Sequence, residues 1–330
     1  MLSLELIEDS RELLGFAAEW SCFLERLPEV TPFQLPDWLL TWWSHFGSGQ
    51  LQTFVFRNGN EIAAILPCFR HEWNGKRQLT LIGSGISDYL EPGIAHAYSA
   101  GVLQMLKERL KQDHAWDVCS WQDLNANTPL QALAACDEFA ALVEPDAECA
   151  ETHLYGGFEQ YWKDRPHGLR RNLRRYLEKA RTIDDPEFRV ITGADPELID
   201  ALIALHTARW RKHGESGMIV QNHSALFLRE IIARFAARDM LRFFSLRFAG
   251  RIVSVIASFR YRNVLFSYLS AFDPEYETLG FGRSLLYYAL RHAFDMHYES
   301  WNFLRGNEPY KFEWGARSIP KCRITLTRGA

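Results

Sequence analysis

The strongest constraint on the fold is an order of predicted elements that the chain runs through twice. In the first half, two apolar runs within residues 51–70 flank Asn58-Gly59-Asn60, and asparagine–glycine between such runs predicts a β-hairpin. Next come a strand that ends in a glycine-containing loop (76–94), a helix with apolar residues at helical spacing (97–113) and a further strand (115–124).

The second half repeats this order about 190 residues later. A hairpin around Ala249-Gly250 (240–262) precedes a strand (263–274), a glycine loop with a helix (276–294) and another strand (299–306). Agreement in order over four elements is harder to obtain by chance than one matching hairpin. The pattern therefore predicts an internal duplication.

The length of the chain and a change in composition near its middle predict two domains. A chain of 330 residues exceeds the size at which a single core keeps growing. Residues 142–166 are rich in glycine, proline and acidic residues and indicate a boundary near residue 150. We predict an α/β (α+β) protein with tandem domains at 1–150 and 151–330, each a mixed, largely antiparallel sheet flanked by helices. Further helices are predicted at 168–181, at 196–214 with Gly214 as the stop, and at 223–239.

Composition excludes several classes of protein. The net charge is −4, so no global field favours nucleic acid or a membrane surface, and any polyanion site has to be local. The N-terminus lacks the basic and apolar regions of a signal peptide, and no apolar run is long enough to span a bilayer. The six cysteines are scattered without a Cys-x-x-Cys pair, which indicates reduced thiols and neither a metal site nor a disulfide framework. We expect a cytoplasmic protein without a metal.

The glycine loop of the second half is a candidate anion site. Closely spaced glycines let consecutive N–H groups point at one oxygen, and the N-terminus of a helix adds a partial positive charge. The candidate residues here are Leu279, Gly280, Phe281, Gly282 and Arg283. The alternative is that two glycines only form the turn into an ordinary helix. The dinucleotide fingerprint and the P-loop are excluded, because the third glycine and a Gly-Lys-Ser/Thr sequence are absent.

The element order around this loop resembles that of the GNAT acyltransferases. In that family a loop of the form Gln/Arg-x-x-Gly-x-Gly/Ala grips the pyrophosphate of acyl-CoA, and residues 277–282 match it except that Glu277 replaces Gln or Arg. The stretches 33–43, 87–92, 206–210 and 301–316 resemble the large two-domain GNAT group that includes CelD-type acetyltransferases of polysaccharide biosynthesis. That group is related to the Fem peptidyltransferases, whose long coiled-coil insertion is not visible here.

The resemblance implies two tandem GNAT-like domains, acyl-CoA as co-substrate and a set of site residues in the second domain. The donor would lie against the strand 265–272, with Tyr268 and Ser270 beside it and its backbone N–H groups facing the thioester carbonyl. Tyr310 is a possible acid for the leaving thiolate, and Lys311 is a possible ligand of phosphate or carboxylate. The alternative for both is a packed aromatic ring beside a solvated lysine.

Other candidates flank the predicted cleft. Arg305 and Glu308 follow a strand end, a common site position in α/β sheets, and either can instead be half of an ordinary ion pair. His206 is a candidate base and shares a helix with Arg209 and Trp210, although a lone helical histidine is more often structural.

The first domain carries its candidates in the loop that corresponds to the phosphate loop. Asp88 and Glu91 lie there, but no Gly-x-Gly opens a helix in the same way. We interpret this domain as a degenerate copy that supplies acceptor-binding residues. The alternative for Asp88 is a turn-forming aspartate.

A basic helix stands apart from these candidates. Arg170, Arg171, Arg174 and Arg175 form a stripe in which like charges repel, which suggests an anionic partner. That partner would be the CoA 3′-phosphate, an anionic acceptor or transfer RNA. The alternative is a solvated face neutralised by Glu178 and nearby acids.

Three functions follow. The first is an acyltransferase that moves an acetyl or other acyl group from acyl-CoA to an amine or hydroxyl of a small-molecule or saccharide acceptor, directly and without a covalent enzyme intermediate. The second is a Fem-like transferase that takes an aminoacyl group from transfer RNA, against which the net negative charge counts. The third is a non-catalytic binding protein of GNAT fold, for which Glu277 is the best support.

Overall fold

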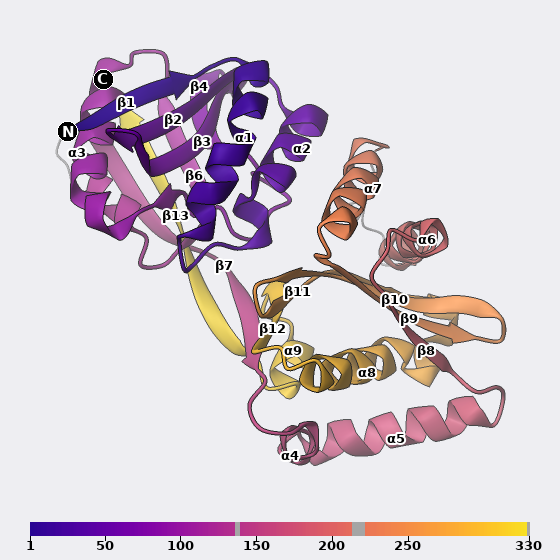
Figure 1. The fold of residues 1–330 in the computed structure, drawn as a ribbon. Helices are drawn as coiled ribbons and strands as arrows, with labels where there is room; N and C mark the ends of the chain where they lie inside the picture. Colours follow the sequence, from indigo (N-terminus) through magenta and orange to yellow (C-terminus); the bar gives the residue numbers. More distant parts are fainter. Residues whose placement is uncertain (136–138, 213–221, 329–330) are drawn as a thin grey trace. The chain divides into compact units, whose positions relative to one another are not determined.

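The computed structural model describes residues 1–135, 139–212 and 222–328. The chain forms two compact units: unit 1 is Met1–Ala147 with Pro320–Ala330, and unit 2 is Glu148–Ile319 (Figure 1). The division predicted from the sequence, at residue 150, differs from these units at the C-terminal end, because residues 320–330 belong to unit 1.

Unit 1 begins with an edge strand of its sheet, followed by two helices. Its elements, in chain order, are β1 (Leu2–Ile7), α1 (Ser10–Glu25), η1 (Pro32–Gln34), α2 (Pro36–Phe46), β2 (Gln50–Asn58), β3 (Glu61–Trp73), β4 (Lys76–Leu81), β5 (Gly93–Ile94), η2 (His96–Tyr98), α3 (Ser99–Gln112), β6 (Val118–Asn125) and η3 (Pro129–Leu133).

Unit 2 has the same core order with two extra helices in front. Its elements are α4 (Phe158–Lys163), α5 (His167–Arg181), β8 (Glu187–Ile191), α6 (Pro196–Lys212), α7 (Asn222–Ala237), β9 (Leu241–Phe248), β10 (Arg251–Tyr261), β11 (Val264–Phe272), η4 (Pro274–Leu279), α8 (Phe281–Asp295), β12 (Ser300–Arg305) and α9 (Pro309–Glu313). Two long strands, β7 (Phe139–His153) and β13 (Arg317–Arg328), have residues in both units. Gly214, the predicted end of α6, lies outside the described residues.

Strand pairing confirms the repeated order. In unit 1, β2, β3 and β4 pair antiparallel in turn, and β4 then pairs parallel with β6. In unit 2, β9, β10 and β11 pair antiparallel in turn, and β11 pairs parallel with β12. The strand order is β1-β2-β3-β4-β6-β13-β7-β12-β11-β10-β9-β8, with β5 paired to β3 off this path, so the fold is mixed α/β, as predicted. The second hairpin turns through Ala249 and Gly250, both at positive φ, as a tight turn between twisted strands requires.

The strand that closes each sheet comes from the other half of the sequence. In unit 2, β12 pairs antiparallel with residues 149–153 of β7. In unit 1, β6 pairs antiparallel with residues 321–327 of β13. The segment 142–166, which composition marks as a linker, therefore contains the end of β7 and all of α4. The acidic residues and proline of β7 did not reveal this strand, because its pairing partners lie far away in the sequence.

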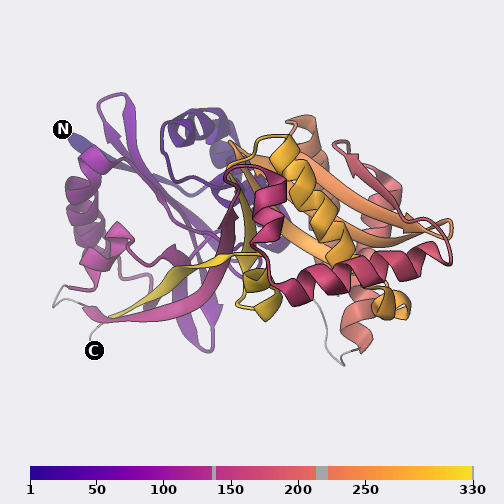
Figure 2. The same ribbon diagram turned by 90° about the horizontal axis from the view of Figure 1, so that it is seen from below.

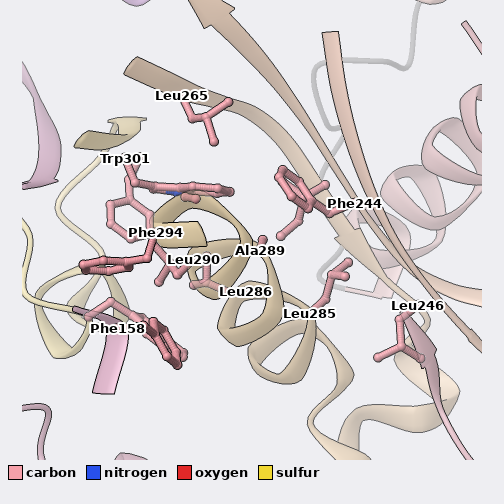
Figure 3. Packing of buried hydrophobic residues seen from close by; sticks show 14 of the residues in the cluster. Phe158, Phe244, Leu246, Leu265, Leu285, Leu286, Ala289, Leu290, Phe294 and Trp301 are labelled. Atoms are coloured by element: carbon pink, nitrogen blue, oxygen red, sulfur yellow. The ribbon is translucent and has the colours of Figure 1, made fainter. Parts of the chain in front are cut away.

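In unit 2 the helices cover both faces of the sheet. Figure 1 shows α6 and α7 on one face of β8–β11 and α4, α5 and α8 on the other. Figure 2, seen from below, has α4 and α5 in front of the sheet, on the α8 side. Helix α8 lies against the strands because its apolar residues recur at helical spacing, as at Leu285, Ala289 and Phe294. Figure 3 shows these side chains packed between Phe158 of α4 and residues of the strands, among them Trp301.

The described residues hold no helix that is long and apolar enough to cross a membrane. Within the same residues, no three His, Cys, Asp or Glu side chains come close enough to hold a metal ion. Cys68, Cys119, Cys149 and Cys322 are buried free thiols and Cys22 is exposed. The sixth cysteine, Cys136, lies outside the described residues.

Candidate functional site

A cavity of about 260 Å³ opens in unit 2 where β11 and β12 part. The two strands pair from Val264 opposite Ser300 to Phe266 opposite Asn302. Past this point β11 contains a bulge, while β12 stays bonded to β7 through Leu304 and Arg305. The space between the strands is lined by Ser267 and Ser270 from β11, by Phe303 from β12 and by Tyr310 from α9.

The N-terminus of α8 borders this cavity. Gly280 caps the helix in the left-handed conformation (φ 60°), and no side chain bonds to the N–H groups of the first turn. Gly282 and Arg283 line the cavity, whereas Leu279 and Phe281 are buried in the core of unit 2. Of the five loop residues predicted to hold phosphate, the structure thus brings two to the cavity. Free N–H groups at a helix N-terminus are a common feature of anion sites.

Arg283 has a carboxylate partner in this structure. Its Nη1 lies 3.0 Å from Oε2 of Glu313, and both side chains are partly exposed. The sequence predicts Arg283 as a residue of the anion site; in this structure a carboxylate from α9 is its partner. Nothing in the sequence marked Glu313, because the pair joins two helices separated by a strand.

Arg209 is the second arginine at the cavity. It reaches the wall from α6, with its guanidinium carbon 5.3 Å from the centre of the Phe272 ring. Phe272 in turn packs beside Gly282, where an added Cβ would lie 3.1 Å from Cδ1 of the phenyl ring. Among the described residues that line the cavity, two are arginines and none carries a carboxylate. The cavity is therefore suited to an anionic ligand.

His206 is buried and faces its helical neighbour. Trp210 donates a hydrogen bond from Nε1 to Nε2 of His206 at 2.9 Å. Burial, with a smaller contribution from Arg209, lowers the pKa of His206 to about 4, so the ring is neutral at pH 7. A neutral ring that accepts at Nε2 carries its proton on Nδ1, which has no partner among the described residues. This arrangement leaves His206 no free lone pair with which to accept a substrate proton.

Tyr310 faces the cavity and packs edge-on against Phe303, with ring centres 6.3 Å apart. Burial, with a smaller contribution from Glu308, raises the pKa of Tyr310 to about 12. The phenol therefore keeps its proton at neutral pH, as a proton donor has to.

The Lys311 ammonium makes all of its contacts within the loop between β12 and α9. Its Nζ donates to the carbonyl oxygens of Leu304, Arg305 and Gly306 at 3.2, 2.5 and 3.1 Å and lies 2.9 Å from the carboxylate of Glu308. Only 2% of Lys311 is exposed. Lys311 and Glu308 thus hold the loop together, and Arg305 contributes its backbone to the same clamp. No donor of Lys311 is left for a phosphate.

The bulge in β11 decides which side chains of that strand line the cavity. Ala257 of β10 pairs with Leu269 and Ser258 pairs with Ser267, so Tyr268 is the extra residue. Tyr268 stacks on Phe259, with ring centres 5.2 Å apart, and does not line the cavity. Regular alternation would place Tyr268 and Ser270 on one face. The bulge breaks this alternation and puts Ser267 in the lining with Ser270, which sequence reasoning missed.

Asp88 and Glu91 belong to unit 1. Glu91 accepts hydrogen bonds from the Asn125 N–H at 3.0 Å and the Thr128 hydroxyl at 2.6 Å. Burial raises the pKa of its carboxyl. The cavity beside Glu91 is only about 10 Å³. Glu91 therefore ties the loop after β4 to the end of β6, and Asp88 is half-buried in the same loop.

The basic helix is α5. Leu169 and Leu173 face the core, while Arg171, Arg174 and Arg175 are exposed. Arg170 donates from Nε to the carbonyl of Arg165 at 3.1 Å. In the described part of the chain, the three exposed arginines form no ion pair, either with Glu178 or with another carboxylate.

Comparison with known proteins finds a family match for most of unit 2. Residues 167–312 match a family model described as an acetyltransferase (GNAT) domain. No curated protein matches the chain at a significant level.

Solved structures share the fold over nearly the whole chain. FemX has a TM-score of 0.68 at 8% identity and covers 98% of this chain and 96% of its own. The C-terminal domain (DUF2156) of a putative lysylphosphatidylglycerol synthetase from Agrobacterium fabrum has a TM-score of 0.59 at 12% identity, covering 97% and 93%. A tandem GNAT protein from the clavulanic acid biosynthesis pathway has a TM-score of 0.50 at 11% identity, covering 100% and 99%. At these identities the likeness shows the fold alone. Residues 167–312 thus match the GNAT acetyltransferase domain model, in a chain that folds like FemX and a tandem GNAT protein.

Proposed function

We propose that this protein is an acyl-CoA-dependent acyltransferase that moves an acetyl or other acyl group to an amine or hydroxyl of a small-molecule or saccharide acceptor in the cytoplasm. The observation that carries the proposal is the cavity between β11 and β12, with the uncapped N-terminus of α8 at its border. A donor with its diphosphate at α8 would place its acyl end toward Ser267, Ser270 and Tyr310. The match of residues 167–312 to the GNAT domain supports this choice of donor.

In the proposed reaction the acceptor attacks the thioester carbonyl carbon directly. N–H groups of β11 donate to the carbonyl oxygen as it becomes negative, and the C–S bond then breaks. Tyr310 gives its proton to the departing thiolate, while the acceptor loses its own proton to solvent or to a base. His206 is left out as that base, because its accepting nitrogen is bonded to Trp210. That unit 1 supplies acceptor-binding residues, Asp88 and Glu91 among them, stays a prediction.

Thermal unfolding with acetyl-CoA, longer acyl-CoAs and free CoA tests the proposal. A ligand that binds only the folded state raises the midpoint as RT ln(1 + [L]/Kd). We expect a shift for the wild type and none for Gly282→Asp, whose carboxylate would repel phosphate while suiting the first turn of a helix. Gly282→Ala, which adds volume without charge, is the matched control and should keep the shift. Gly280 is unsuited to the test, because its φ of 60° strains any other residue.

The absence of a shift with every CoA species would contradict the proposal. The transfer RNA-dependent transferase and the non-catalytic binding protein would then be the remaining functions.

A further inference from the structure

Cations on α5 lie beside the N-terminus of α8. The ring of Tyr176 packs on Gly280, so closely that an added Cβ would lie 2.3 Å from Cδ2 of the ring. The guanidinium carbon of Arg175 lies 5.7 Å from the centre of the same ring. Tyr176 is therefore a spacer between the glycine that caps α8 and the Arg175 guanidinium.

Lys179 adds a second cation on the same side of the helix. It is one turn beyond Arg175, and both residues point to the same flank of Tyr176 because an α-helix turns by about 100° per residue. Both are exposed, and neither has an ion-pair partner among the described residues. Like charges at i and i+4 repel, so this pair is unfavourable until an anion binds.

We infer that Arg175 and Lys179 form a second phosphate subsite, which takes a phosphomonoester of the donor while the first turn of α8 takes its diphosphate. A phosphomonoester carries nearly two negative charges at pH 7, more than one cation neutralises. The guanidinium can bind two of its oxygens and the ammonium a third. The subsite rests on the proposed function, and it selects a nucleotide donor that bears both a diphosphate and a separate phosphate, as CoA does.

Isothermal titration of CoA and dephospho-CoA, which differ only in the 3′-phosphate, tests the subsite at one fixed salt concentration. We expect the wild type to bind CoA about tenfold more tightly than dephospho-CoA, the effect of about one charge-assisted contact. The double variant R175Q/K179Q should bind both ligands equally, with an unchanged affinity for dephospho-CoA. R174Q is the matched control: it removes an exposed, unpaired arginine that lies about 160° around α5 from Tyr176, so the tenfold preference should remain.

The outcomes separate the subsite from the proposed function. Equal affinity of the wild type for both ligands would overturn the subsite and leave the donor site standing. If R174Q lost as much affinity for CoA as R175Q/K179Q, the subsite would also be overturned. A general positive field of the helix would then account for binding. No binding of either ligand would overturn the proposed function and the subsite together. The three substitutions change exposed side chains, and unfolding midpoints without ligand check that each variant is folded.

Discussion

Tyr310 is the residue on which the proposed chemistry depends most directly. Its ring packs against Phe303, while its hydroxyl is the part that would donate a proton. Tyr310→Phe keeps the ring and removes the proton, so we expect kcat to fall about 100-fold, as is typical for loss of a general acid. Donor affinity and unfolding free energy should stay unchanged, as measured by titration and by denaturant. A variant with unaltered kcat would show that Tyr310 is only a packed aromatic residue.

His206 gives a prediction about stability. Its pKa is about 4 in the folded protein and about 6.5 when unfolded, so the unfolded chain binds the extra proton as the pH falls. The stability that comes from burying a neutral ring is complete above pH 6.5 and is lost between about pH 6.5 and 4, by up to roughly 3 kcal/mol.

His206→Gln isolates this contribution, since glutamine can still accept from Trp210 but does not titrate. We expect the unfolding free energy of the wild type to fall more steeply than that of the variant between pH 7 and 4, measured with urea. Parallel curves would show that His206 does not titrate in this way.

At the scale of single elements, the start of α8 depends on one glycine. Gly280 has a left-handed conformation and contacts Tyr176, whereas Gly282 is helical and meets only the edge of Phe272. Gly280→Ala should therefore destabilise the protein by about 1–3 kcal/mol, from backbone strain and the displaced ring. Gly282→Ala should be nearly neutral, because alanine favours the helix. Equal unfolding midpoints for the two variants would contradict this account of the cap.

Local patterns were sufficient to predict many of these elements and less informative about the site. Hairpins, the third strand of each half and α8 follow from turn residues and periodicity, which act between neighbours in the sequence. The bulge at Tyr268 and the burial of Lys311 do not, because both depend on contacts with other segments. The same holds for the Arg283–Glu313 pair. Residue type alone identified the arginines and the tyrosine that line the cavity. It did not show that other candidates, such as Lys311 and Glu308, make structural contacts instead.

At the scale of the whole molecule, the two copies differ in the space that they enclose. Both cavities are lined by corresponding strands, at Ile65 of β3 and Leu81 of β4 in unit 1 and at Ile256 of β10 and Ser267 of β11 in unit 2. In unit 1, Trp38 donates a hydrogen bond to the Ser87 hydroxyl in the loop after β4, and the cavity has a volume of only about 10 Å³. In unit 2 the cavity is about 260 Å³.

One chain should therefore bind one donor molecule. Isothermal titration with acetyl-CoA should give a stoichiometry of one, and Gly282→Asp should abolish the whole signal. A stoichiometry of two, or residual binding by half of the sites in Gly282→Asp, would show that unit 1 also holds a donor.

The exchange of closing strands sets an order for biosynthesis. In unit 2 the partner of β12, residues 149–153 of β7, is translated before β12. The sheet of unit 2 can therefore close as soon as β12 is made. The partner of β6 in unit 1, residues 321–327, leaves the ribosome almost 200 residues after β6 itself. The unit that is made first is thus completed last. Until then β6 has an open edge, which is a template for misassembly, so a nascent chain that stalls before residue 320 is a natural target for chaperones and proteases.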